Sequence, residues 1–311
     1  MSGTNLTIVC YHGVVEYVPE GYNSSGKHML LSEFEKQISF LASHFEIVTM
    51  RDIEIAAQGL QSLPPECVAI TFDDGFLNNL EVAHPILQKY GVPATIYVAT
   101  NFISMSRLIW TDELEILFLE ASSRTLTNNL NGDIAIDLSN RESRYRTLKS
   151  VKKTLKAYPP SKREALMAML KVTLEIEAKE VRKPSLHNFL EWEHLKYMQN
   201  SGLWEVGAHT LNHVSLGTIS NNDIKSEIIG SILKVSQEIG GRHTPLFSYP
   251  EGQEGDIPSL AIDTIKDLGL NSAPSAIYGK NQLPFKCSSE YFKLRRCMVG
   301  FEGLIFPWRM F

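Results

Sequence analysis

Short apolar runs and segments with helical periodicity alternate along most of the chain. Apolar, β-branched runs predict strands at 6–12, 46–49, 68–72, 94–99, 204–209, 246–249 and 293–299. Apolar residues at helical spacing predict helices at 51–58, 79–90, 221–239 and 257–268, and a further helix capped by Ser32. This alternation predicts an α/β fold with a mostly parallel sheet and helices outside it, open or closed into a barrel.

The segment 102–193 breaks this rhythm. It has little β signal and is rich in charged, helix-forming residues, which predict helices at 144–155 and 162–181. We interpret it as a helical insertion within a single domain, 1–311. Two roles stay open for it: a cap that selects the substrate, or a scaffold.

Composition and charge narrow the class of protein. The 311 residues are 43% hydrophobic and 21% charged, as in ordinary globular proteins. The formal net charge of −5 gives no basic excess for binding nucleic acid. The sequence shows no targeting segment and no window of the ~20 apolar residues that a transmembrane helix needs, so we expect a cytoplasmic protein. The oligomeric state is not predicted.

Two adjacent carboxylates, Asp73 and Asp74, follow the predicted strand at 68–72, and Gly75 comes next. Two acids at the edge of a core repel each other and lose hydration, so another group must offset that cost. A divalent cation does so if one carboxylate binds it while the other remains an ionised base. The alternative is structural, because acidic pairs also cap helices and form turns.

His209 and His213 lie four residues apart at the end of another predicted strand. On a helix or tight turn this spacing places both rings on one face. One carboxylate plus two imidazoles is a ligand set of open, catalytic transition-metal sites. We therefore predict one divalent ion, with zinc as the first choice and cobalt, nickel or iron as alternatives.

The chain resembles a known family at these two segments. Residues 71–75 (Thr-Phe-Asp-Asp-Gly) and 209–213 (His-Thr-Leu-Asn-His) are similar to the first two signatures of the polysaccharide deacetylases, the NodB-homology or carbohydrate esterase 4 group. The resemblance implies a distorted (β/α)7 barrel that hydrolyses an N-acetyl or similar small acyl group on a sugar. It also implies that Asp73 is the general base and that the metal ligands are Asp74, His209 and His213.

The general acid is less easily assigned. Many family members carry it in a C-terminal Leu-x-His signature, but no histidine follows His243 here. The N-terminal Tyr11-His12-Gly13-Val14 resembles the Tyr-His-x-Val opening of the circularly permuted branch, in which the strand of the acid comes first. That resemblance makes His12 the candidate acid. A structural histidine bonded to a backbone carbonyl is the alternative.

Tyr249-Pro250-Glu251 resembles the third signature, a loop that walls the pocket and offers a backbone N–H to the oxyanion. Glu251 departs from the aromatic residue expected there, which leaves the acyl and substrate preference open. A plain turn after a strand is the alternative. The arginine that some members place in this loop to pair with the base is missing. Arg296 is our candidate replacement, and an arginine at the surface rim is the alternative.

Within the insertion, residues 110–115 resemble a Trp-x-Asp-x-Leu-Glu run of deacetylases from surface-polysaccharide gene sets. Trp110 offers a flat face to a sugar ring, and the Asp112 carboxylate can accept from hydroxyl groups. The alternative, which we favour, makes Trp110 a core residue and Asp112 a helix cap completed by Glu115.

The leading hypothesis is a metal-dependent deacetylase of an N-acylated sugar or a precursor of a bacterial surface glycan. A second hypothesis keeps the fold but hydrolyses a cyclic imide, ureide or formamide on a non-sugar metabolite. A third is an inactive carbohydrate-binding protein, which would have no need of a base beside a metal ligand.

Overall fold

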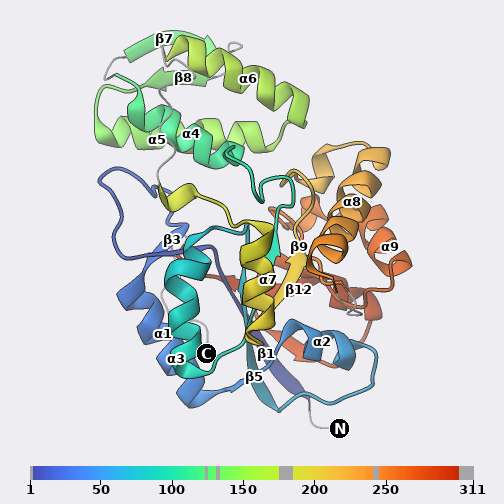
Figure 1. Ribbon diagram of the computed structural model, residues 1–311. Helices are drawn as coiled ribbons and strands as arrows, with labels where there is room; N and C mark the ends of the chain where they lie inside the picture. Colours follow the sequence, from blue (N-terminus) through green and yellow to red (C-terminus); the bar gives the residue numbers. More distant parts are fainter. Residues whose placement is uncertain (1–2, 123–124, 131–133, 175–184, 241–244, 301–311) are drawn as a thin grey trace.

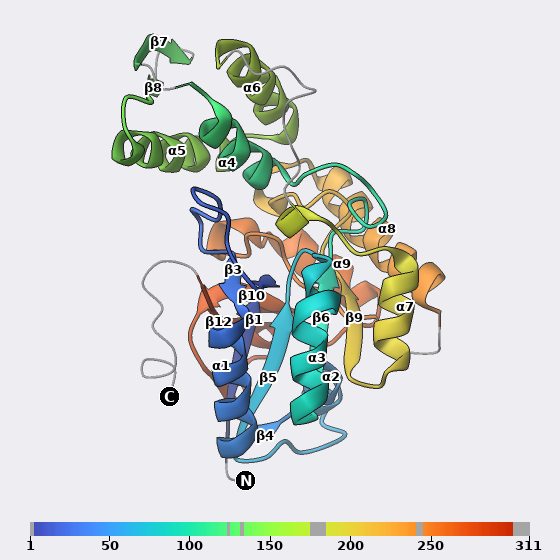
Figure 2. The same cartoon turned by 60° about the vertical axis from the view of Figure 1, so that its left-hand side comes forward.

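The computed structural model describes residues 3–122, 125–130, 134–174, 185–240 and 245–300. Its centre is an eight-stranded sheet in the order β10-β12-β1-β5-β6-β9, with β11 added to β1 and β4 to β5. Figures 1 and 2 show this sheet from two sides. The strands are β1 (Thr4–Tyr11), β4 (Glu46–Ile47), β5 (Glu66–Phe72), β6 (Ala94–Val98), β9 (Trp204–Ala208), β10 (Pro274–Tyr278), β11 (Asn281–Leu283) and β12 (Leu294–Met298). Each pair is parallel except β1 with β11. The predicted α/β fold with a parallel central sheet is confirmed.

Successive residues of the central strands face opposite sides of the sheet, as the two-residue period of a strand requires. On one side of the sheet, Leu6 and Ile8 of β1 pack with Ala69 of β5, and we call this group the inner cluster. On the other side, Val9 and Ile70 belong to a second group, the outer cluster. Helices supply the other side of the outer cluster: α1 (Leu31–His44), α3 (His84–Tyr90), α7 (Trp192–Asn200), α8 (Asn221–Ile239) and α9 (Ser259–Asp267). The inner cluster also receives residues from α2 (Met50–Ala57).

The segment 246–249 lies between the two ends of this sheet. The Ser248 N–H donates to the carbonyl of Ala208 in β9 (3.0 Å), and the Tyr249 N–H donates to the carbonyl of Pro274 in β10 (3.4 Å). Among the described residues only an isolated bridge forms here. The strand predicted at 246–249 is therefore wrong, and the sheet is not closed into a continuous barrel.

The insertion contains α4 (Trp110–Glu120), β7 (Thr125–Leu130), β8 (Ile134–Asp137), α5 (Arg141–Lys156) and α6 (Pro160–Thr173). The antiparallel hairpin of β7 and β8 adds two strands to a segment whose sequence shows little β signal. The helix predicted at 162–181 ends at Thr173, and 175–181 lie outside the described residues. A hydrophobic cluster of its own, including Leu117, Phe118, Val151 and Leu170, holds these elements together. Figures 1 and 2 show the insertion above the C-terminal ends of the central strands.

Two helix starts differ from the sequence-based expectation. Helix α1 begins at Leu31 with Leu30 as its N-cap and no side-chain cap, so the prediction of a Ser32 cap is wrong. The helix predicted at 79–90 is a π-helical turn, η1 (Asn79–Ala83), followed by α3, and it ends at Gly91 with φ +64° as expected. The short 3₁₀ turns are η2 (Ser185–His187), η3 (Leu216–Thr218), η4 (Glu254–Asp256) and η5 (Ser288–Lys293).

A small parallel sheet of β2 (Gly13–Val15) and β3 (His28–Leu30) continues the chain beyond β1. Gly13 is required there because a Cβ would lie 1.9 Å from Nδ1 of His28. All four cysteines are free; Cys287 is exposed and the other three are buried. In the described part of the chain, no helix is both long and apolar enough to cross a bilayer.

Candidate active site

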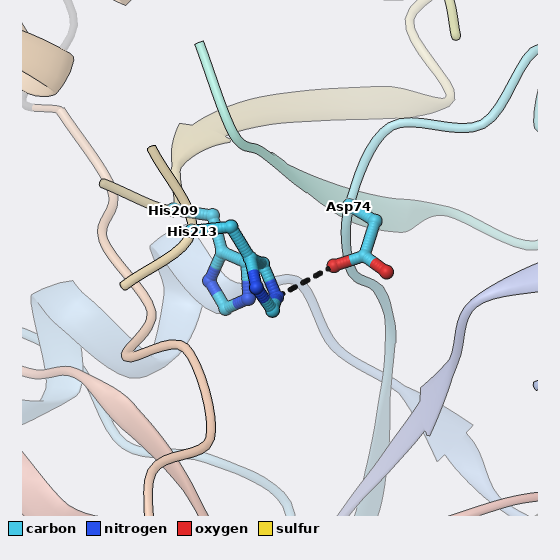
Figure 3. Close-up of side chains that lie close together, drawn as sticks. All are labelled: Asp74, His209 and His213. Atoms are coloured by element: carbon cyan, nitrogen blue, oxygen red, sulfur yellow. Dashed lines mark ion pairs between the residues drawn. The ribbon is translucent and has the colours of Figure 1, made fainter. Parts of the chain in front are cut away.

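Asp74, His209 and His213 converge at the C-terminal ends of β5 and β9 (Figure 3). One ligand atom from each lies within 4.8 Å of the others. Nε2 of His213 is 3.0 Å from Oδ1 of Asp74. Asp74 is fully buried, and its carboxylate oxygens make ion-pair contacts with His213 and with the ammonium of Lys27 but accept no hydrogen bond from any described residue. A buried carboxylate with this unused hydrogen-bonding capacity beside two imidazoles fits a divalent cation.

The backbone is strained where it presents these ligands. Asp74, Thr210 and His213 have φ values of 75°, 61° and 51°, a region that side chains other than glycine rarely adopt. Glu227 of α8 stabilises the histidine loop, residues 209–213, because its carboxylate accepts hydrogen bonds from the N–H groups of Leu211 and Asn212 at 2.8 and 2.9 Å. These charge-assisted hydrogen bonds offset the backbone strain of the loop.

The ring of His209 is fixed by the backbone carbonyl of Ser248, which accepts from Nδ1 at 2.8 Å. Because Nδ1 carries the proton, the lone pair of Nε2 faces the site. Burial lowers the pKa of His209 to about 4, against the opposite effect of the Asp73 carboxylate. His209 is therefore neutral near pH 7, as a metal ligand must be.

Arg296 of β12 donates two parallel hydrogen bonds to Asp73, from Nη1 to Oδ1 at 2.9 Å and from Nη2 to Oδ2 at 2.7 Å. Both residues are buried, so the alternative of a rim arginine is wrong. Arg296 follows the inner-cluster residue Leu294 by two positions, which explains why its side chain points inward. Burial would raise the pKa of Asp73, but Arg296 and nearby histidines lower it to about 2.

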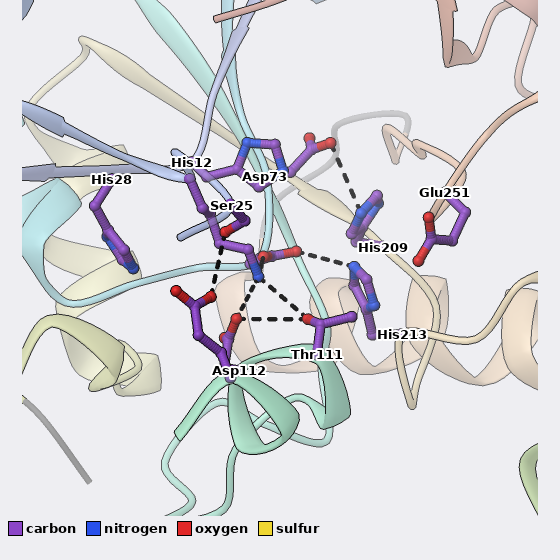
Figure 4. A network of polar contacts seen from close by, with 12 residues as sticks. His12, Ser25, His28, Asp73, Thr111, Asp112, His209, His213 and Glu251 are labelled. Atoms are coloured by element: carbon purple, nitrogen blue, oxygen red, sulfur yellow. Dashed lines mark hydrogen bonds and ion pairs between the residues drawn. The ribbon is translucent and has the colours of Figure 1, made fainter. Parts of the chain in front are cut away.

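His12 directly follows β1 and lines the same pocket as Asp73 and Asp74 (Figure 4). The Asn79 side chain donates to the carbonyl of His12 at 2.6 Å and fixes the end of the strand. Burial lowers the pKa of His12, while the Asp74 and Asp73 carboxylates act in the opposite direction. Its role as the acid stays a prediction.

The pocket around these residues has a volume of about 280 Å³. Tyr249 and Glu251 of the third predicted signature line it, and Pro250 does not. Glu251 has φ +59° and forms an ion pair with Lys156 of α5 in the insertion. The insertion therefore contributes directly to the wall of the site.

Comparison with known proteins fits this geometry. Residues 61–273 match the sequence model of the family described as polysaccharide deacetylase. The chain belongs to that family. The curated protein YxkH of Bacillus subtilis (strain 168) is 31% identical over 113 residues, which are 35% of this chain and 37% of YxkH. The chain thus matches little more than a third of that relative's length.

Solved deacetylase structures share the fold. The Streptococcus pyogenes deacetylase PplD, in complex with acetate, is 15% identical with a TM-score of 0.61 over 96% of this chain and 93% of that chain. IcaB from Ammonifex degensii is 17% identical with a TM-score of 0.58, again over 96% of this chain and 93% of its own. At these identities the likeness concerns the fold. The circularly permuted branch, by contrast, stays a prediction.

Two predicted residues of the insertion, Trp110 and Asp112, do not line the pocket around Asp73 and Asp74. Trp110 packs, partly buried, against two hydrophobic clusters, which agrees with the core alternative. Its ring also stacks against the Arg163 guanidinium at 4.8 Å and lines a separate surface hollow. Asp112 is not a helix cap, because α4 begins at Trp110 after Ile109; the capping interpretation is wrong. Its carboxylate instead binds Lys27 at 2.7 Å (Figure 4).

Sequence reasoning missed three residues of the site. Lys27 is buried, and its ammonium lies 3.4 Å from Asp74 as well as 2.7 Å from Asp112. Glu227 holds the histidine loop, and Lys156 pairs with Glu251. Each lies far in the sequence from its partner and in a segment whose pattern gives no sign of the contact. The Asp112 side chain was thus flagged for its chemistry, but its lysine partner was not.

Proposed function

We propose that this chain is a metal-dependent hydrolase that removes an N-acetyl or similar small acyl group from an amino sugar of a glycan or glycan precursor. The observation that carries the proposal is the sharing of one pocket by Asp73 and the cluster of Asp74, His209 and His213. One carboxylate is available as a base while its neighbour belongs to the ligand set. Membership of the polysaccharide deacetylase family supports the reaction class.

Asp74, His209 and His213 would hold the cation, for which zinc is our first choice and cobalt, nickel or iron are alternatives. When bound, such an ion lowers the pKa of a water molecule and polarises the acyl carbonyl. The remaining tasks fall to the side chains and backbone of this chain.

Asp73 accepts a proton from the water whose oxygen bonds to the acyl carbon. Its low pKa keeps it ionised near neutral pH, and Arg296 holds both of its oxygens in a fixed plane. A base held in this way needs no reorganisation before the proton transfer. Arg296 is thus a positioning residue for Asp73.

The carbon–nitrogen bond then breaks, and the departing amine takes a proton because an amide anion is a poor leaving group. His12 is our candidate to supply that proton, since it follows β1, the parallel neighbour of β5, and lines the same pocket as Asp73. The loop 249–251 walls the acyl group, and a backbone N–H of this loop is the predicted partner of the oxyanion.

The decisive experiment compares acetate release from N-acetylglucosamine oligomers by the wild type and by Asp73→Asn, with the metal content of both measured. We expect Asp73→Asn to retain its metal and to lose about a thousandfold in turnover. Chelation should abolish wild-type activity, and added zinc should restore it. Full turnover by Asp73→Asn would contradict the assigned base. Opening of a cyclic imide without acetate release would favour the non-sugar hydrolase, and metal binding without any turnover would favour the binding protein.

A further inference from the structure

Helix α5 of the insertion presents three lysines toward the active site. Lys149, Lys152 and Lys156 are spaced by three and four residues, which places them on one helix face. Lys152 and Lys156 line the catalytic pocket, and they also line an adjoining hollow of about 290 Å³ together with Lys149. The two cavities thus meet at this helix.

Most cations at this junction already have a carboxylate partner. Lys27 binds Asp112 and Asp74, and Lys156 binds Glu251. Lys152 differs, because within the described ranges no carboxylate lies within ion-pair distance of its ammonium. Burial and the charges of Lys27 and Lys156 lower the pKa of Lys152. A half-buried ammonium among other cations is unfavourable unless an anion joins it.

The adjoining hollow is built to receive a polar group. Its other lining residues include Ser24, Ser25 and Tyr145, which supply hydroxyl groups and an aromatic ring. The acidic residue in its wall, Glu115, is already engaged by the Ser24 N–H and by the Ser25 hydroxyl. Three lysines and this single carboxylate line the hollow, so its net formal charge is positive.

We propose that Lys149, Lys152 and Lys156 form a subsite for an anionic group, a phosphate or a carboxylate, carried by the N-acylated sugar beside the acyl group that is removed. This inference rests on the proposed function and deepens it, because it assigns the substrate to the negatively charged sugars. The insertion then selects the substrate, with Lys152 supplying the free cation.

The test compares an N-acetylglucosamine oligomer with two charged probes, N-acetylglucosamine 1-phosphate and an N-acetylhexosaminuronic acid. We expect Lys152→Ala to lower the ratio of kcat/KM for a charged probe to kcat/KM for the oligomer by about tenfold, the effect of one lost charge contact. Lys153→Ala is the matched control, because Lys153 is exposed on the same helix and lines neither cavity. The probe that shows the larger ratio identifies the anion as phosphate or carboxylate.

A binding measurement separates this inference from the proposed function. Titration calorimetry with N-acetylglucosamine 1-phosphate and with the uronic acid uses Asp73→Asn protein, with and without Lys152→Ala, so that no turnover is needed. About tenfold weaker binding of either probe to the double variant supports the subsite even if no acetate is ever released. Equal binding of both probes to the two proteins, or equal ratios in wild type and Lys152→Ala, overturns it while leaving the deacetylase assignment intact.

Discussion

Arg296 and Asp73 are 223 positions apart in the sequence and meet in a two-point contact between guanidinium and carboxylate. Both side chains are buried, and each charge is neutralised chiefly by the other. A fork of this kind fixes direction as well as distance. The contact therefore links β12, the final strand in chain order among those described, to the proposed base.

Removing Arg296 should destabilise the fold. Arg296→Met leaves the Asp73 carboxylate buried without its partner, so we expect the free energy of unfolding to fall by about 3–5 kcal/mol. The double variant Arg296→Met with Asp73→Asn should regain part of that loss, since no unpaired charge remains. Urea denaturation of the wild type, Arg296→Met and the double variant measures the loss of stability and its partial recovery. A single variant as stable as wild type would show that the pair contributes little.

Replacing His12 should affect turnover without affecting the metal. His12→Gln removes the predicted acid but none of the three ligands, so we expect a loss of about a hundredfold or more in kcat with unchanged metal content. His44→Gln is the control because His44 is exposed and remote from the pocket. An unchanged rate in His12→Gln would assign this histidine to the structural role instead.

Glu227 should matter for metal affinity although it touches no ligand atom. Glu227→Gln weakens the hydrogen bonds to the N–H groups of Leu211 and Asn212, which hold the strained histidine loop. We expect zinc affinity to fall by about tenfold or more, as for other residues that orient metal ligands. Glu238→Gln, on the same helix and paired only with Lys234 among the described residues, should bind zinc like wild type. A competition titration with a chromogenic chelator gives both affinities.

Lys27 should be a strong contributor to stability. Lys27→Met leaves the Asp112 and Asp74 carboxylates buried without their cation, and we expect a loss of about 3 kcal/mol in the metal-free protein. Lys36→Met removes an exposed ion pair with Glu33 and should change the stability very little. Denaturation midpoints compare the two. Equal effects would mean that Lys27 is better hydrated than its burial indicates.

His28 should make stability depend on pH. Burial, with a smaller effect of His187, lowers the pKa of His28 to about 3, below the ~6.5 of an unfolded histidine. As the pH falls below 6.5, His28 takes up a proton in the unfolded chain but not in the folded chain. Its contribution to stability is therefore complete above pH 6.5 and is lost progressively toward pH 3. Between pH 7 and pH 5 this amounts to about 2 kcal/mol.

The pH effect is measured as a difference between variants, because other buried histidines also contribute. Urea unfolding of His28→Gln at pH 7 and pH 5 should show a smaller loss of stability than wild type, by about 2 kcal/mol. His44→Gln should keep the wild-type loss. An undiminished loss in His28→Gln would mean that His28 is protonated in the folded protein.

The local sequence pattern was sufficient to predict the central strands and to select the candidate metal ligands. Apolar β-branched runs favour a buried strand, and the residue types of Asp73, Asp74, His209 and His213 limit their chemistry. The 246–249 run shows the limit of such patterns, because its apolar residues are buried without joining a ladder. Strand pairing depends on neighbours that the local sequence does not specify.

Only the tertiary structure decided which charges meet. Arg296 with Asp73, Lys27 with Asp74 and Asp112, and Lys156 with Glu251 all join segments far apart in the chain. An ion pair leaves no periodic trace in the sequence, since one side chain at one position is enough to form it. The chain alone therefore indicated the candidate reacting groups, while folding determined their partners, their pKa values and the place of helix α5 above them.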